Sequence, residues 1–488
     1  MPCTTILVGK KASNDGSTMI ARTDDGFFDV KKLVVVEPKK QPKKYKSVIG
    51  HLTVELPEEA MRYTALPNVD PKKEGIWAAA GINAANVGMT ATETITSNPR
   101  VLAADPMVEY RKAEKRGEKD TPGGIGEEDL LVLVLPYIHS AREGVLRTAS
   151  LLEKYGTYEM NGIGFNDEHE VWWMETIGGH HWMAKRVPDD ACVIAPNQFG
   201  MDSFDLEDAF GKQEAHLCSA DLREFIRDNH LDLNQNGAFN PRDIFGSHDD
   251  SDHIYNTPRA WFMGRYLTPY SHVWEGPDAE FTPESDNIPW CLVPDRKVTA
   301  EDVKYILSMH YQGTEYDPYA GKDTGKRGMY RSIGINRTGD TAICQIRSDV
   351  PDPLKGIEWV IFGSTTFAPA LPVYANVPSM PKYLSEVAME PSTENLYWAS
   401  RTIAALTDAN YHTSIQQIER WQNAVHTKGR QIIREYDQKM TESGDYALTA
   451  EANEKICKMA KEQTTKTLGK VLHDASMHMK NGFNRADH

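Results

Sequence analysis

The chain has 488 residues and a formal net charge of −16 at pH 7, with 40% apolar and 25% charged residues. These proportions are ordinary for a soluble globular protein. The acidic charge argues against nucleic acid or an anionic membrane as the main partner. No apolar stretch reaches the ~20 residues that a membrane-spanning helix needs, so we expect no membrane partner either.

The first third of the chain is expected to be rich in β-strands. Apolar and β-branched residues fill 3–8, and the turn-forming sequence Ser13-Asn14-Asp15-Gly16 separates that run from the next. The pattern predicts strands over 3–8, 17–21, 32–37, 75–80 and 87–94.

The remainder alternates between helical and strand patterns. Apolar residues at helical spacing predict two helices over 127–141 and 141–156, and long charged periodic segments predict C-terminal helices. The order strands, helices, strands, helices favours a layered α+β fold. We expect a main body over 1–390 and a helical region over 391–488 packed on it, with further strands over 162–175, 182–195, 333–347 and 357–362 and helices over 395–439 and 450–480.

Cys3 is the most informative single residue. If Met1 and Pro2 are removed, Cys3 carries a thiol and a free α-amine on one residue. An α-amine has a reference pKa of roughly 7.7–8.0, so it can take the thiol proton and generate the nucleophilic thiolate. The alternative is an ordinary buried cysteine at the start of a strand.

A charged cluster follows the second strand. If the hairpin turn centres near Ser13, Cys3 lies across from Thr23, and Arg22 and Asp25 fall beside the nucleophile. An arginine near a cysteine lowers the pKa of the thiol, and a carboxylate can orient the α-ammonium. The alternative is a solvated Arg–Asp pair at a surface turn, which would contribute little to stability.

The segments CTTILVGKKAS over 3–13 and IARTDDG over 20–26 resemble the start of the bacterial cysteine dipeptidases. These are N-terminal-nucleophile hydrolases related to penicillin V acylase and bile salt hydrolase. The resemblance runs over nearly the whole chain and is strongest in the first thirty residues, in 81–94 and in 161–197. It implies a four-layer αββα fold, removal of a short leader, here residues 1–2, and a cysteine that attacks an amide carbonyl.

The resemblance assigns roles to individual residues. Cys3 matches the nucleophile and Arg22 and Asp25 the Arg-x-x-Asp that follows it, with Asp24 as an alternative to Asp25. Asn197 matches an asparagine that donates to the oxyanion. Other matches are Arg259, with Arg265 as its alternative, as a later active-site arginine, and Asn83, Thr92 and Glu93 in the segment expected to contact substrate.

The expected activity is therefore hydrolysis of dipeptides of broad specificity through a thioester on Cys3. The same fold could instead hydrolyse N-acyl amides of the bile salt or penicillin V type. Neither reaction needs a cofactor, and small peptides are the expected partners. No GxGxxG or GxxxxGK[ST] motif suggests a nucleotide site.

Two other patterns suggest metal binding. Residues 232–243 have the spacing of an EF-hand calcium loop, weakened by asparagines at Asn234 and Asn236 and by Asp243 in place of glutamate. The histidines of 248–253 and of 180–181 could suggest a metallopeptidase, but no HExxH is present. We expect no catalytic metal.

The six cysteines are far apart and form no CxxC pair, which favours free thiols in a reducing compartment. We therefore expect a cytoplasmic protein. The resemblance to the acidic enzymes of this class implies a homo-oligomer.

Overall fold

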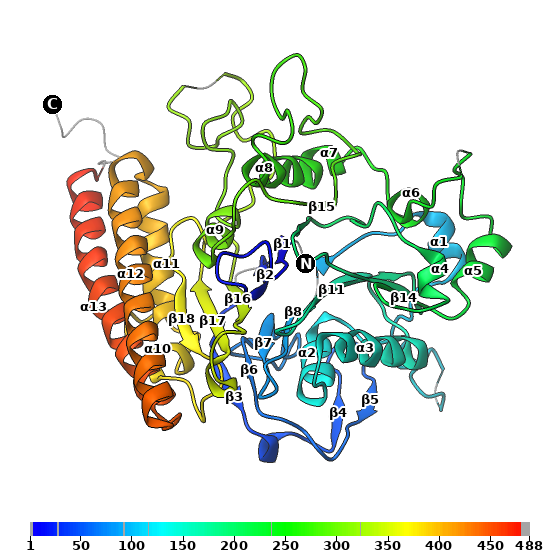
Figure 1. Ribbon diagram of the computed structural model, residues 1–488, viewed down its shortest axis with the longest axis horizontal. Coiled ribbons are helices and arrows are strands. Elements are labelled where there is room, and N and C mark those ends of the chain that lie inside the picture. Colours follow the sequence, from blue (N-terminus) through cyan, green and yellow to red (C-terminus); the bar gives the residue numbers. More distant parts are fainter. Residues whose placement is uncertain are drawn as a thin grey trace.

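The computed structural model describes residues 3–26, 29–90, 93–115, 117–235, 237–322 and 324–479. Two antiparallel sheets form its centre, and helices pack on the outer sides of both (Figure 1).

The first sheet carries the start of the chain. Its central strands are buried along their whole length, because the second sheet covers one face and helices cover the other. Strands covered on both faces have continuous apolar runs rather than alternating ones, as the first strand has. The strand order is β15 (Cys291–Leu292), β13 (Cys192–Ala195), β1 (Thr5–Val8), β2 (Thr18–Asp24), β16 (Asp340–Ile346), β17 (Gly356–Phe362) and β18 (Leu371–Tyr374).

The second sheet packs against β2 and β16 of the first. The two sheets are also linked by hydrogen bonds, since Asn166 Nδ2 donates to Thr18 Oγ1 and to the Cys344 carbonyl, both at 3.0 Å. The strand order is β14 (His216–Cys218), β12 (His181–Arg186), β11 (Val171–Ile177), β10 (Asn161–Asn166), β8 (Gly88–Thr90) and β7 (Ala80–Ile82), and β9 (Glu93–Thr94) also pairs with β10.

Two small hairpin-like sheets flank this core, β3 (Val34–Val36) with β6 (Tyr63–Ala65) and β4 (Lys44–Lys46) with β5 (Thr53–Glu55).

The helices form the two outer layers. Helix α3 packs on the second sheet, whereas α11, α12 and α13 pack on β17 and β18. The helices are α1 (Pro99–Ala104), α2 (Glu127–Val134), α3 (Ala141–Tyr155), α4 (Leu206–Ala209), α5 (Leu222–Asp228), α6 (Pro241–Phe245), α7 (Asp252–Tyr255), α8 (Thr257–Leu267), α9 (Ala300–Ile306), α10 (Lys382–Ser385), α11 (Leu396–Asp408), α12 (Tyr411–Ser443) and α13 (Leu448–Met477), with short 3₁₀ turns at Pro38–Lys40, Leu135–Tyr137 and Asp352–Leu354.

Glycines allow the outer helices to approach the sheets closely. A Cβ at Gly144 of α3 would lie 2.4 Å from Phe165 of β10, and one at Gly429 of α12 would lie 2.8 Å from Pro372 of β18. The sequence of layers is helices, sheet, sheet, helices, so the predicted four-layer αββα arrangement is confirmed. The C-terminal helices lie on the first sheet, as expected, and the domain boundary at residue 390 stays a prediction.

Several predicted elements are divided in the structure. The predicted helix over 127–141 is α2 followed by a 3₁₀ turn that contains Pro136, because proline cannot continue an α-helix. The predicted strand over 162–175 is the hairpin β10–β11. The predicted helix over 395–439 is two helices, α11 and α12.

The register of the first hairpin differs from the prediction by one residue. Thr5 pairs with Arg22, and the Thr23 amide donates to the Thr4 carbonyl at 3.0 Å, so the expected pairing of Cys3 with Thr23 is wrong. Since side chains alternate between the faces of a strand, a shift of one residue exchanges the faces. Arg22 therefore shares the face of Cys3, whereas Thr23 and Asp25 share the face of Thr4.

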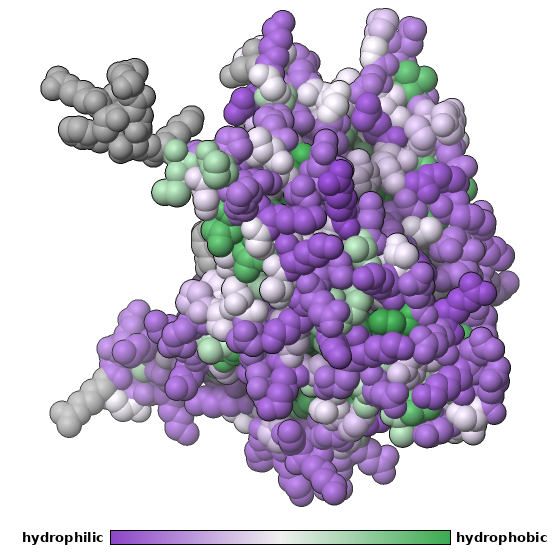
Figure 2. Space-filling view, turned by 90° about the vertical axis from the view of Figure 1, so that its left-hand side faces the viewer, coloured by the Kyte–Doolittle hydropathy of each residue, from purple (hydrophilic) through white to green (hydrophobic). Residues whose placement is uncertain are grey.

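The outer side of the C-terminal helices is largely hydrophilic with scattered hydrophobic residues (Figure 2). Among the residues that the structure describes, none of the helices combines the length and the apolar character needed to cross a bilayer.

Lys304 lies beneath this layer, on α9, and is 4% exposed. Burial lowers the pKa of Lys304 to about 7. This is below the ~10.4 of an unfolded chain, so between about pH 7 and pH 10 the unfolded state binds more protons and the stability rises with pH. We expect Lys304→Met to raise the free energy of unfolding at pH 7 by on the order of 2–4 kcal/mol and to remove this pH dependence.

Chemical denaturation of both proteins at pH 7 and pH 9 would measure this effect. Lys428→Met, at an exposed position of α12, is the matched control and should leave the stability almost unchanged. A Lys304→Met protein with the pH dependence of the parent would contradict the prediction.

Candidate active site

The thiol of Cys3 lies in a fully buried, charged environment. Cys3 precedes β1 and is 0% exposed, and Arg22 Nη2 of β2 lies 2.8 Å from Cys3 Sγ. Burial raises the pKa of the Cys3 thiol, and the positive charge of Arg22 acts in the opposite direction. Burial thus favours the neutral form of the thiol, and a base that accepts its proton would assist its attack.

Arg22 is held by a carboxylate from a distant part of the chain. Its guanidinium forms an ion pair with Glu127 of α2, and both side chains are 1% exposed. The Glu127 amide donates to Glu159 Oε1 at 2.7 Å. Burial, with the neighbouring charge of Glu127, raises the pKa of Glu159 to about 7. Separation of a buried ion pair is costly, because it leaves an uncompensated charge. This network therefore holds Arg22 beside the thiol.

Asn197 contacts the backbone nitrogen of Cys3. The Cys3 N–H donates to Asn197 Oδ1 at 3.1 Å, and Arg259 Nη2 donates to the same oxygen at 2.8 Å. Because both groups donate, the atom that they contact must be the amide oxygen of Asn197, and this fixes the orientation of the Asn197 amide. Asn197 Nδ2 donates to the Thr94 carbonyl at 2.9 Å. Asn197 thus orients the nitrogen of Cys3, and its expected donation to an oxyanion stays a prediction.

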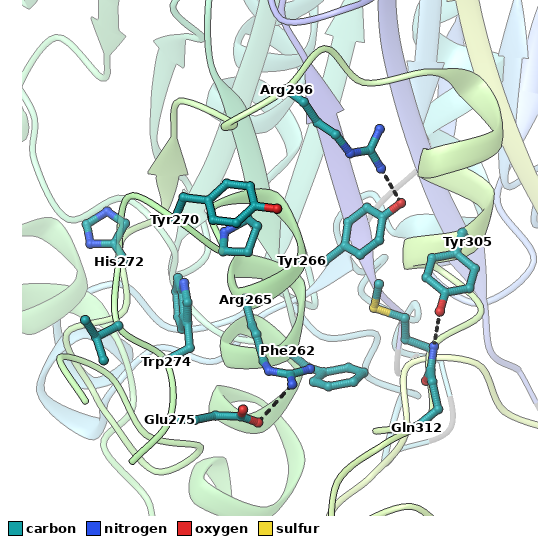
Figure 3. A pocket seen from close by; sticks show the side chains of 13 residues that line it. Phe262, Arg265, Tyr266, Tyr270, His272, Trp274, Glu275, Arg296, Tyr305 and Gln312 are labelled. Atoms are coloured by element: carbon teal, nitrogen blue, oxygen red, sulfur yellow. Dashed lines mark hydrogen bonds and ion pairs between the residues drawn. The ribbon is translucent and has the colours of Figure 1, made fainter. Parts of the chain in front are cut away.

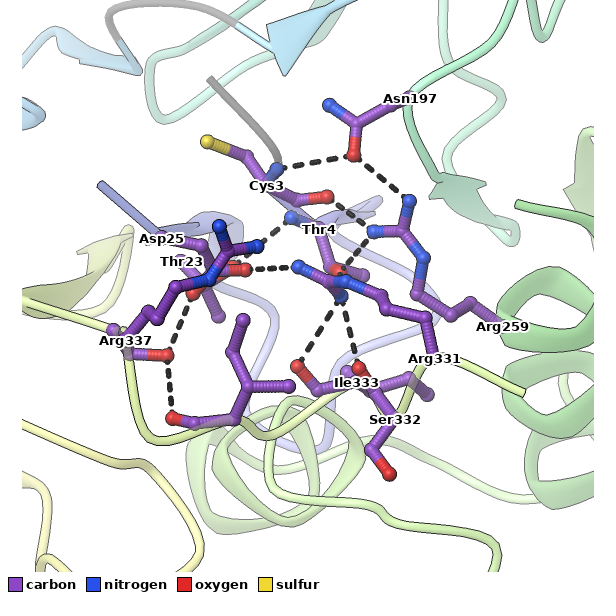
Figure 4. Close-up of polar contacts among 12 residues, drawn as sticks. Cys3, Thr4, Thr23, Asp25, Asn197, Arg259, Arg331, Ser332, Ile333 and Arg337 are labelled. Carbon is purple, nitrogen blue, oxygen red and sulfur yellow. Dashed lines mark hydrogen bonds and ion pairs between the residues drawn. The ribbon is translucent and has the colours of Figure 1, made fainter. Parts of the chain in front are cut away.

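Arg259 of α8 braces the same backbone segment from the other side (Figure 4). It is fully buried, and its N–H groups are directed at protein acceptors rather than at an open space. The acceptors are the Cys3 carbonyl, Thr4 Oγ1 at 2.7 Å, Asn197 Oδ1 at 2.8 Å, Asn256 Oδ1 at 2.7 Å and the Tyr255 carbonyl at 2.7 Å.

Arg265, the alternative to Arg259, lies in a different place. It pairs with Glu275 at 3.0 Å and lines a cavity of about 800 Å³ that is rich in aromatic side chains such as Trp274 (Figure 3). Apart from Arg265, none of the predicted site residues that the structure describes lines this cavity. Of the two arginines, the structure places Arg259 at Cys3.

Asp25 is linked to the Cys3 segment through other residues. It is fully buried, pairs with Arg331, and accepts from Thr338 Oγ1 at 2.6 Å and from Thr23 Oγ1 at 3.0 Å. Thr23 Oγ1 in turn accepts from the Thr4 amide at 3.0 Å. Asp25 is thus linked to the strand that carries Cys3 through Thr23, as Figure 4 shows.

Asp24, the alternative to Asp25, forms a separate buried ion pair with Lys31 at 2.6 Å. The positive charge of Lys31 holds the pKa of Asp24 below its usual value against the effect of burial.

The comparisons with known proteins can now be set beside this geometry. The model of Peptidase family C69 matches residues 2–424. The chain belongs to this family. It is therefore a hydrolase of the cysteine-peptidase type, and the predicted resemblance is confirmed at the level of the family.

Relatives of this C69 peptidase match over almost their whole length. A "Dipeptidase" of Bifidobacterium longum is 50% identical, and a "Probable dipeptidase A" of Streptococcus pyogenes is 47% identical, each over 100% of both chains. A mutant conjugated bile acid hydrolase of Clostridium perfringens, known from its crystal structure, is 11% identical with a TM-score of 0.30, over 74% of this chain and 89% of that one.

Two predicted contributors to the C69 site lie apart from it or outside the described residues. Asn83 Nδ2 donates to the carbonyls of Leu135 and Ile138, and its Oδ1 accepts from the amides of Ala85 and Val87, so it supports the β7–β8 turn. Thr92 lies outside the described residues, as do Met1 and Pro2.

Glu93 is described only by its backbone, which pairs with Gly162. The substrate-binding roles of Asn83, Thr92 and Glu93 stay predictions.

Two residues of the network were not anticipated. Glu127 opens α2 within the run Glu127-Glu128-Asp129, and acidic residues are common in the first turn of any helix. Arg331 follows an irregular segment and has no local pattern. The one available signal was that three acidic residues open an otherwise apolar helix, so they would be buried together with it.

The described residues give no support to the metal-binding alternatives. No group of three or more His, Cys, Asp or Glu side chains is placed to hold a metal in that part of the chain. His180 and His181 both contact Asp105 instead, at 3.0 and 2.8 Å. The predicted calcium loop contains Asn236, which lies outside the described residues.

Proposed function

We propose that this C69 peptidase is a dipeptidase and that Cys3, freed at its nitrogen by removal of residues 1–2, is both nucleophile and base. The observation that supports this most directly is the pair of contacts made by the sulfur and by the backbone nitrogen of Cys3. Sγ lies against Arg22, and the nitrogen lies against Asn197 Oδ1. A carbonyl oxygen positioned at that nitrogen would orient a free amine toward the thiol.

The proposed reaction has two halves. The α-amine of Cys3 takes the thiol proton as sulfur attacks the peptide carbonyl, and the tetrahedral intermediate collapses when the resulting ammonium protonates the leaving amine. Water then attacks the thioester, with the same amine as base, and releases the second amino acid. Burial raises the pKa of the Cys3 thiol, which favours a mechanism in which a base on the same residue takes the proton.

The other residues act through Cys3 in this proposal. Arg22 stabilises the developing thiolate, and Glu127 holds Arg22. Arg259 and Asp25 fix the backbone on either side of the nucleophile. Since the N–H groups of Arg259 bond to the protein, we assign it to positioning and not to binding a substrate carboxylate.

Hydrolysis of a panel of dipeptides and of acyl-glycine conjugates separates this proposal from the N-acyl amide hydrolase. We expect release of amino acids from the dipeptides and at least ~100-fold lower kcat/KM on the acyl conjugates. The reverse preference would show the N-acyl amide activity. The intact mass of the active protein should lack Met1 and Pro2, and full activity with Pro2 retained would remove the proposed base.

A further inference from the structure

A second cavity reaches the candidate active site itself. It has a volume of about 520 Å³, within the range of small-molecule sites, and Asn197 forms part of its wall. The rest of the wall comes from Thr94 of β9, from Thr96 just after it, and from residues 247–256, which include α7. Asn197 also contacts the nitrogen of Cys3, so this one residue connects the wall of the cavity to the nucleophile.

Two carboxylates line this cavity, Asp249 and Asp252. Asp252 is only 9% exposed, and it accepts hydrogen bonds from Ser247 Oγ at 3.3 Å and from Asn256 Nδ2. Both donors are neutral. Within the described ranges neither aspartate forms an ion pair with a lysine, arginine or histidine, and the Asp249 side chain is exposed at the cavity.

A carboxylate that is buried without a cation is costly. Burial accordingly raises the pKa of Asp252. Arg259 is committed to the Cys3 segment and Arg331 to Asp25. A cationic group in the cavity would therefore stabilise the charged form of Asp252.

Hydrogen bonds connect Asp252 to the nucleophile. Asn256 donates to Asp252 and to the Asn197 carbonyl, the latter at 3.1 Å, and it accepts from Arg259. The carboxylate is therefore held in a fixed relation to Cys3. Such a fixed relation is what a site needs when it positions a substrate by one charged group.

We propose that this cavity, the Asp249–Asp252 cavity, binds the α-ammonium group of the substrate's N-terminal residue. The inference rests on the proposed dipeptidase function and names the group that the enzyme recognises. A free ammonium supplies the cation that both carboxylates lack. Peptides whose N-terminus is acylated carry no such charge, so they are excluded by the same cavity.

The test compares alanyl-alanine as substrate with propionyl-alanine, which lacks only the ammonium, as competitive inhibitor. In Asp249→Asn we expect the KM for alanyl-alanine to rise about tenfold while the Ki of propionyl-alanine changes less than twofold. Asp252→Asn should show a larger effect of the same kind. Asp250→Asn, at the adjacent exposed residue outside the cavity wall, is the matched control and should behave as the parent.

An unchanged KM in Asp249→Asn, or equal changes in the KM and the Ki, would overturn the inference. Asp249 is exposed, so its substitution tests the idea even if Asp252→Asn fails to fold. The proposed function fails separately, if the parent protein does not hydrolyse alanyl-alanine at all.

Discussion

Replacement of Cys3 by alanine is expected to lower kcat/KM on dipeptides by at least about 10⁴-fold, because the nucleophilic sulfur is lost and the α-amine that remains has no thiol to activate. Cys3→Ser keeps a nucleophilic atom and the amine but replaces the thiol by a far less acidic hydroxyl, so we expect a loss of about 10²-fold or more. Steady-state hydrolysis of alanyl-alanine measures both changes.

Cys192→Ala is the matched control for this pair. Cys192 is fully buried in β13, in the same sheet as β1, and it pairs with Val8 rather than with a residue of the site. Its substitution should reduce stability slightly and leave kcat/KM within about threefold. Substantial activity in Cys3→Ala would rule out Cys3 as the nucleophile. Loss of activity in Cys192→Ala would show that a general defect of the sheet explains the loss in both alanine variants.

The sequence predicted the layered fold because local signals agree with the global arrangement. The apolar run at the start, the Asn14-Asp15-Gly16 turn and the charged periodic C-terminal segments each indicate an element that the structure contains. Register is less well specified: the first turn is one residue longer than the prediction allowed, and β2 accordingly shows its other face to Cys3.

The residues beside Cys3 were predictable only where the hairpin or the family motif reaches them. Arg22 lies on the neighbouring strand, so spacing alone brought it close. Glu127 and Arg331 lie 105 residues from Arg22 and 306 from Asp25, and chain-distant contacts of this kind leave no periodic pattern. Glu127 reaches Arg22 from α2, and Arg331 reaches Asp25 from the segment that precedes β16.

Replacement of Glu127 by glutamine is expected to make the Cys3 thiol more acidic while it destabilises the fold. Glu127 raises the pKa of Cys3 and Arg22 lowers it, so removal of the carboxylate leaves the effect of Arg22 uncompensated. The midpoint of the pH dependence of Cys3 alkylation by iodoacetamide should shift to lower pH. The free energy of unfolding should fall by about 2–4 kcal/mol, since a buried guanidinium loses its charged partner.

Glu128→Gln provides the comparison one residue away. Glu128 bonds to Ser47 at 3.0 Å and to Tyr158, not to Arg22, and burial raises its pKa to about 7. Glutamine therefore resembles the partly protonated acid already present at pH 7, and we expect little change in the alkylation midpoint. A shift of that midpoint to higher pH in Glu127→Gln would mean that Arg22 leaves the thiol once Glu127 is gone. In that case the role of Glu127 in positioning Arg22 outweighs the effect of its own charge on the pKa of the thiol. The kcat/KM should then fall toward that of an Arg22→Met variant.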